Sequence, residues 1–244
     1  MGNFEILDPK QHRHLTVMRQ HGADYGDNTM LSLAYPFEFR ALQAEYPILF
    51  KKSEDTGQFQ AIALFGFSSE ENLFLKGDAW QARSLPLAIK REPFLLTERR
   101  SADSDTPQDF VISMNMEHPR IPLPGGDPLF TEDGDPTAYL QEVMGYLKAM
   151  QEGYEQSQQF FAALEREQLL TAINIDIPLP DPIELTGFYS IDEEQLQALS
   201  AEAMQRLQQA GWITPIYMQL ASLSQMTGLI QKKIALSDPS NSQQ

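Results

Sequence analysis

Several short segments of the chain combine apolar runs with strand-like residue types, and polar turns separate them. The connection Ser53–Gln58 is one example. It is too short for the crossover that parallel strands require, so it favours antiparallel pairing of the strands on either side. Such segments are bounded by turn-forming residues, as strands usually are. We expect one mainly antiparallel sheet with strands at Met30–Ala34, Ile48–Lys51, Phe59–Phe65, Leu73–Leu75 and Phe110–Met114. Further strands are expected at Phe4–Leu7, Ala172–Ile177 and Ile183–Ile191.

The longest helical pattern runs from about residue 136 to residue 170, where apolar residues recur at intervals of three and four. Asp135 is expected to cap this helix, with Pro136 at its first position. Gly145 and Gly153 each cost about 1 kcal/mol inside a helix relative to alanine. The pattern therefore leaves two alternatives open, one bent helix or two helices, and it predicts that the helical segment near Leu140–Leu164 covers one face of the sheet.

Shorter helical patterns complete the chain. They are expected at Phe37–Tyr46, Leu85–Phe94, Asp192–Leu199 after a capping box at Ser190 and Glu193, Ala201–Ala210 and Ile216–Lys233. Together the segments predict an α+β fold, with a mainly antiparallel sheet covered by a long helix and C-terminal helices. We expect a single domain over residues 1–236, an exposed loop at Glu98–Asp109 and a disordered tail over residues 237–244.

Composition narrows the class of protein. The formal net charge is -16, which argues against nucleic acid as a partner because phosphate backbones are bound by clustered Lys and Arg. There is no cysteine, so disulfides and thiolate chemistry are excluded. No apolar run reaches the ~20 residues of a membrane helix, and the N-terminus shows no secretory signal pattern. We expect a soluble, acidic, cytoplasmic protein without membrane insertion, and export by a route without an N-terminal signal stays open.

Motifs of known catalytic and cofactor sites are absent from the sequence, including the phosphate-binding loop and the nucleophile elbow. The tripeptide Asp55-Thr56-Gly57 is expected to be a polar turn. Near the N-terminus, His12, His14 and His21 with Asp24 and Asp27 offer metal-ligand types, but their spacing matches no known site. We therefore expect no metal and no cofactor.

Aromatic residues beside turns are expected to anchor loops to the core. They are Trp80, Phe94 and Trp212.

A set of short motifs runs through nearly the whole chain in a fixed order. The motifs are Glu38-Phe39, Leu42, Tyr46-Pro47-Ile48, Phe50, Ala63-Leu64-Phe65-Gly66, Asn72-Leu73-Phe74, Trp80, Pro93-Phe94, Pro128-Leu129-Phe130 with Gly134, Gly187–Asp192, Gly211-Trp212 and Ala221-Ser222-Leu223. In this order they resemble the SapC family of Gram-negative bacterial proteins. Two positions depart from the family pattern, since Asn115 stands where an Asp is expected and Gln219 where a His is expected.

The resemblance implies two alternative functions. The first is a non-catalytic accessory or binding protein, associated with a bacterial surface layer, whose partner is an unidentified protein or small molecule. The second is an enzyme or enzyme subunit that works with flavin-dependent halogenase-like or oxygenase partners. The family's label as a permease conflicts with the lack of a spanning segment. Candidate polar site residues are Glu38, Asn72, Arg91 and His118, and a deep pocket lined by Glu38, Arg91 or His118 would favour the second function.

Overall fold

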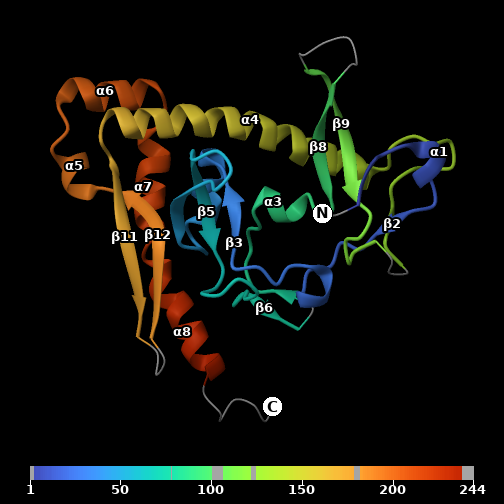
Figure 1. Ribbon diagram of the computed structural model, residues 1–244, viewed down its shortest axis with the longest axis horizontal. Coiled ribbons are helices and arrows are strands. Elements are labelled where there is room, and N and C mark those ends of the chain that lie inside the picture. The colour runs from blue at the N-terminus through green and yellow to red at the C-terminus, as the bar shows by residue number, and fades with distance from the viewer. Residues whose placement is uncertain (1–2, 78, 101–106, 122–124, 179–181, 238–244) are drawn as a thin grey trace. The chain divides into compact units, whose positions relative to one another are not determined.

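The computed structural model describes residues 3–77, 79–100, 107–121, 125–178 and 182–237. Both helices and antiparallel sheets are present, which confirms the α+β fold class (Figure 1). No helix within these ranges is long and apolar enough to cross a membrane. The described residues divide into two compact units, which are treated separately below. Unit 1 comprises the described residues within 1–28, 75–81 and 87–151, and unit 2 comprises those within 29–74, 82–86 and 152–244. The prediction of a single domain over residues 1–236 stays a prediction. Of the predicted tail over residues 237–244, Ser237 is the last residue of a helix, and residues 238–244 lie outside the described residues.

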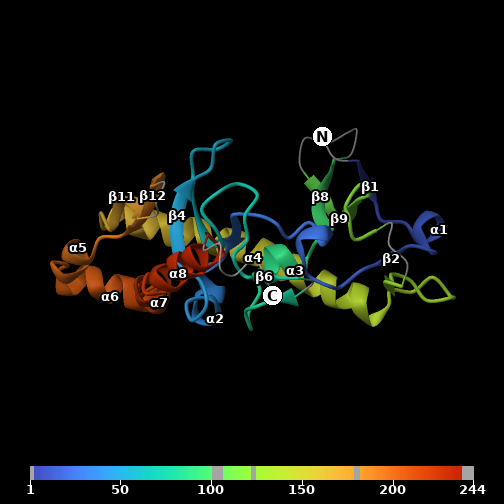
Figure 2. The same ribbon diagram turned by 90° about the horizontal axis from the view of Figure 1, so that it is seen from below.

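Unit 2 contains a five-stranded antiparallel sheet in the order β11-β12-β4-β5-β3. Its strands are β3 (Leu31–Ala34), β4 (Ile48–Lys52), β5 (Phe59–Leu64), β11 (Leu170–Ile177) and β12 (Ile183–Ile191). Its helices are the 3-10 helix η2 (Pro36–Glu38), α2 (Phe39–Leu42), α5 (Glu193–Gln197), α6 (Ala201–Gln209), α7 (Ile213–Ser222) and α8 (Gln225–Ser237). Figure 2 shows the C-terminal helices following one another.

Unit 1 contains a three-stranded antiparallel sheet in the order β1-β9-β8 and two small β-ribbons. The strands are β1 (Phe4–Ile6), β8 (Phe94–Arg100), β9 (Pro107–Asn115), β2 (Thr16–Val17) with β10 (Asp127–Pro128), and β6 (Leu75–Lys76) with β7 (Ala79–Trp80). The short helices are α1 (Pro9–His12), the 3-10 helix η1 (Ala23–Tyr25) and α3 (Leu87–Lys90).

The long helix α4 (Ala138–Arg166) is continuous over 29 residues and contributes to both units. In unit 1 its apolar stripe packs on a buried cluster that includes Phe94 and Met114. In unit 2, Phe160 and Phe161 meet Phe50 edge to face, at ring-centroid distances of 6.2 and 5.0 Å. The prediction that a long helix covers a sheet is therefore confirmed.

The predicted membership of the sheet is partly wrong. Strand β9, predicted at Phe110–Met114, pairs with β1 and β8 in unit 1, and Leu75 pairs in a separate ribbon. The large sheet instead recruits β12 beside β4. The apolar pattern identifies a strand, but it does not identify the partner of that strand. The predicted loop at Glu98–Asp109 is also wrong at its ends, because β8 extends to Arg100 and β9 begins at Pro107.

Two predicted helix caps and one predicted helix are corrected as well. Pro136 forms an isolated β-bridge with Phe130, and the side chain of Thr137 caps α4 by accepting the N–H of Leu140 at 3.3 Å. Asp192 caps α5 by accepting the N–H of Gln195 at 3.0 Å, so Ser190 is not the cap. The last predicted helix is two helices, α7 and α8.

Gly153 explains why α4 tolerates glycine in its interior. A Cβ atom at this position would lie 2.7 Å from a ring carbon of Phe37 and 2.8 Å from Cγ of Tyr35, so only glycine lets the two rings approach the helix. A Cβ atom at Gly145 would meet nothing within 4 Å. The two glycines therefore have different structural roles.

We expect opposite effects on stability when each glycine is replaced by alanine. Gly145→Ala should raise the free energy of unfolding by about 0.5–1 kcal/mol, because only the helix propensity changes. Gly153→Ala should lower it by about 1–3 kcal/mol, because the new methyl group overpacks the interface with Tyr35 and Phe37. Urea unfolding of both variants measures the difference. Equal stabilisation by both substitutions would contradict the assigned packing role of Gly153.

Candidate functional site

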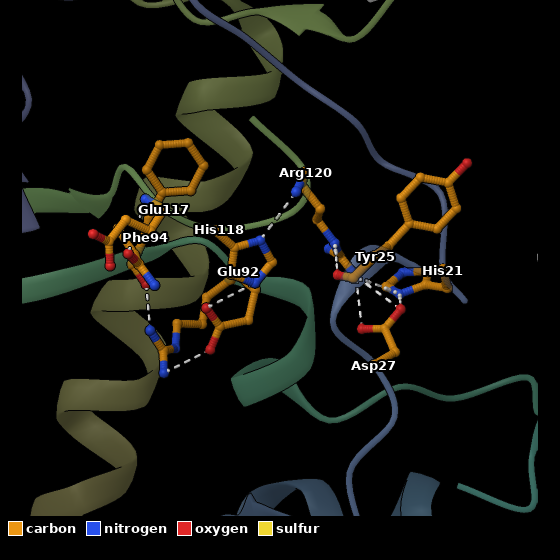
Figure 3. A network of polar contacts seen from close by, with 10 residues as sticks. His21, Tyr25, Asp27, Glu92, Phe94, Glu117, His118 and Arg120 are labelled. Carbon is orange, nitrogen blue, oxygen red and sulfur yellow. Dashed lines mark hydrogen bonds and ion pairs between the residues drawn. The ribbon is translucent and has the colours of Figure 1, made fainter. Parts of the chain in front are cut away.

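A buried ion pair lies at the centre of a polar network in unit 1 (Figure 3). The Nη2 atom of Arg120 donates to both carboxylate oxygens of Asp27, at 2.7 and 3.0 Å, and each side chain is only 3% exposed. The Nε atom of Arg120 also donates to the backbone carbonyl of Tyr25 at 3.3 Å, and the N–H of Gly22 donates to Asp27 at 2.9 Å. A buried charge pair needs such additional hydrogen bonds, because they offset part of the cost of removing both charges from water.

His21 joins this pair through Nδ1. This atom lies 3.1 Å from Oδ2 of Asp27 and 2.9 Å from Nη2 of Arg120. An unprotonated Nδ1 accepts from the guanidinium, whereas a protonated Nδ1 donates to the carboxylate, so both tautomers find a partner. The imidazole also meets Trp80 edge to face at 5.9 Å.

Glu92 and His118 form the second part of the network. Glu92 lies two residues after α3, and its carboxylate is 3.0 Å from Nη2 of Arg91 and 3.7 Å from Nε2 of His118. The Nδ1 atom of His118 accepts the backbone N–H of Arg120 at 3.3 Å, which assigns the ring proton of the neutral imidazole to Nε2, facing Glu92. Arg91 is held in turn by a 2.6 Å hydrogen bond to the carbonyl of Phe94.

Burial changes the protonation of both groups. Burial, as the larger cause, and the nearby positive charge of Arg120 together lower the pKa of His118 to about 4. Burial also raises the pKa of the Glu92 carboxyl, against the opposing effect of Arg91. His118 is therefore neutral at pH 7. A neutral imidazole beside a carboxyl with a raised pKa is a pair that can transfer protons.

Of the predicted site residues, Arg91 and His118 both contact Glu92. Glu38 and Asn72 belong to unit 2 and bond to nearby backbone: Glu38 accepts the N–H of Tyr35 at 3.1 Å, and Asn72 accepts the N–H of Phe74 at 3.0 Å. Sequence reasoning missed Glu92 and Arg120, since neither belongs to a motif or a periodic pattern.

The N-terminal histidines do not converge. His21 reaches Asp27, where the guanidinium of Arg120 is the neighbouring cation, and His12 instead lies 3.2 Å from Glu5. Within the described ranges, no group of three or more His, Asp or Glu side chains is arranged to hold a metal ion.

Unit 2 contains a cavity of about 420 Å³ between the sheet and the C-terminal half of α4. Its lining comes from the end of β3 and Tyr35, from the turn and first residues of β5, and from one face of α4. The lining residues are Leu33, Ala34, Tyr35, Thr56, Gly57, Gln58, Phe59, Gln60, Ala61, Tyr154, Ser157, Gln158, Phe161, Ala162 and Glu165. Glu165 is the only ionisable carboxylate among them, and none of the predicted site residues is part of this lining.

Comparison with known proteins identifies the family. The family model for SapC matches residues 7–229, which is most of the chain, and the chain therefore belongs to the SapC family. No curated protein and no solved structure matches the chain.

We predict that Arg120 and Asp27 stabilise unit 1 as a pair. Arg120→Met should lower the free energy of unfolding by about 3–5 kcal/mol, because it leaves Asp27 buried without its counter-charge. Arg19→Met is a control, since Arg19 and its partners Glu142 and Asp127 are each about half exposed and the expected loss is at most about 1 kcal/mol. Chemical denaturation measures both. Equal losses would contradict a special role for the buried pair.

The lowered pKa of His118 predicts a dependence of stability on pH. The unfolded state binds a proton at this histidine near pH 6.5 whereas the folded state does so near pH 4, so the contribution of His118 to stability falls as the pH is lowered through this window. The raised pKa of Glu92 acts in the opposite direction. His118→Gln should therefore flatten the stability profile between pH 6.5 and pH 4. An unchanged slope, or an imidazole that titrates near pH 6.5 by NMR, would contradict the assignment.

Proposed function

We propose that this member of the SapC family is a non-catalytic binding or accessory protein and that the cavity of unit 2 is its ligand site. The observation that carries the proposal is the lining of the cavity, which consists of aromatic rings, small aliphatic side chains, hydroxyl groups and amides around a single carboxylate. Such a lining supplies shape and hydrogen bonds for recognition, but it lacks the paired titratable groups of general acid and base chemistry.

The cavity is a consequence of residue size. Ala34 and Ala61 are paired across β3 and β5, so their side chains share one face of the sheet. On the same strand, Phe59 stacks on Phe161 of α4 at 5.8 Å. Two alanines beside aromatic residues leave the space between sheet and helix incompletely filled. Its volume is in the range of ~300–1,000 Å³ that ligand pockets occupy.

The family association with a bacterial surface layer supplies a setting for this function. We place the protein in an accessory role to surface assembly, in which it binds a component through the cavity. The net charge of -16 makes an anionic polymer a poor partner and a neutral or cationic one a better fit.

A second candidate function rests on Glu92 and His118. A carboxyl with a raised pKa facing a neutral imidazole favours proton transfer, which fits an enzyme or enzyme subunit that works with flavin-dependent halogenase-like or oxygenase partners. Against this, Glu92 is also paired with Arg91, and buried ion-pair networks perturb pKa values without any catalytic role.

A fragment screen by two-dimensional NMR distinguishes the two functions. Amide shifts on addition of small aromatic and amide-containing fragments should cluster on the cavity lining, for example at Gln58, Gln60 and Gln158. Ala162→Trp should abolish them, because Ala162 is an exposed residue of α4 that lines the cavity. Gln159→Trp, on an exposed neighbour that does not line it, should leave them unchanged. Shifts that cluster at Glu92 and His118 instead would overturn the proposal in favour of the enzyme.

A further inference from the structure

The ligand class can be inferred from the way the sheet ends at the cavity. Strand β3 is an edge strand, and its pairing with β5 stops at Ala34, opposite Ala61. Tyr35 is still extended, but Pro36 begins the 3-10 helix η2 and the chain leaves the sheet. Strand β5 starts two residues earlier, at Phe59, so its first residues have a neighbour in β4 but none in β3.

The hydrogen-bond alternation of antiparallel strands shows where the backbone groups of Phe59 point. The backbone N–H of Ser53 donates to the carbonyl of Gln58 at 2.8 Å, and the backbone N–H of Leu64 donates to the carbonyl of Pro47 at 3.0 Å. The backbone groups of the even-numbered residues of β5 therefore bond to β4. The backbone N–H of Phe65 donates to the carbonyl of Met30 at 2.7 Å, so the backbone N–H and C=O groups of the odd-numbered residues point towards β3. Phe59 is odd-numbered, and its N–H and C=O therefore point to the side where β3 has already ended. The residue lines the cavity at this place.

Two further features of the cavity complement a peptide. The face shared by Ala34, Ala61 and Phe59 is apolar, so it suits an apolar side chain from a strand that continues the line of β3. Glu165 is exposed and makes no ion pair among the residues that the structure describes, which provides an anionic partner at the same cavity. Side chains two positions apart on a strand share a face, so an apolar residue and a basic residue in that spacing match the two features.

From this arrangement we infer that the cavity binds an extended peptide segment, which adds to the sheet beyond the end of β3 and carries an apolar residue two positions from a Lys or Arg. The apolar residue exchanges two backbone hydrogen bonds with Phe59, as in other cases of strand addition to a sheet edge. This inference rests on the proposed binding function and names the ligand class for the same site.

The probes are fluorescein-labelled hexapeptides with Val and Lys two positions apart, in both orders, among serines. Binding is followed by fluorescence anisotropy. Replacing Lys by Glu in the peptide should weaken binding about tenfold or more through repulsion by Glu165, and N-methylation of the Val amide should weaken it about tenfold by removing the hydrogen bond to Phe59. On the protein, Glu165→Gln should reduce the preference for Lys over Glu, whereas Glu155→Gln, an exposed control outside the cavity lining, should preserve it.

The outcomes separate the peptide class from the binding function. Ala162→Trp should abolish peptide binding and Gln159→Trp should retain it. If fragments bind in the cavity but no peptide does, the peptide class is overturned and the binding function stands. Peptide binding that survives Ala162→Trp, or that is insensitive to N-methylation, would also overturn the inference. If neither fragments nor peptides bind, both the inference and the proposed function fail.

Discussion

The five-stranded sheet of unit 2 depends on one fully buried amide, that of Gln219. Strands β4 and β12 pair over only two residue positions, and Gln219 extends this short junction from α7. Its Nε2 donates to the carbonyl of Ile48 at 2.9 Å, and its Oε1 accepts the N–H of Ile191 at 3.3 Å. Ser222, one helical turn later, accepts the N–H of Ile48 at 2.9 Å. Without the amide of Gln219, the buried N–H of Ile191 would be left unsatisfied, at a cost of about 1–3 kcal/mol.

The two ends of the β4–β5 strand pair therefore differ in how their backbone groups are covered. At Ile48, side chains from α7 satisfy the backbone, and the core closes around buried aromatic residues such as Phe39 and Tyr46. At Phe59, the neighbouring strand has ended and a cavity remains. Exposed backbone groups at a sheet edge attract other strands, and proteins normally cover them. At this uncovered end, the proposed peptide ligand completes the sheet.

The sequence predicted the positions of the helices and strands better than it predicted which strands pair with one another. Helix α4 and strands β3 to β5 follow from periodicity and turn residues, which are local properties. The assignment of β9 to unit 1 and of β12 to the large sheet depends on contacts such as Gln219 with Ile48, between residues distant in the chain, and no local pattern carries this information. The candidate site shows the same limit. His118 and Arg91 can be proposed from their residue types alone. Their common partner Glu92 and the ion pair of Arg120 with Asp27 depend on contacts between segments that are separate in the sequence.

Amide hydrogen exchange in the free protein tests whether β5 has an unpaired backbone edge at Phe59. The N–H groups of Ala61 and Ala63 face β3 within the ladder and should be protected, whereas that of Phe59 faces the cavity and should exchange much faster. NMR-detected exchange resolves these three amides individually. Fast exchange at Phe59 with slow exchange at Ala61 and Ala63 is the predicted result. Protection of Phe59 equal to that of Ala61 would show that its backbone already has a partner, and it would contradict the account.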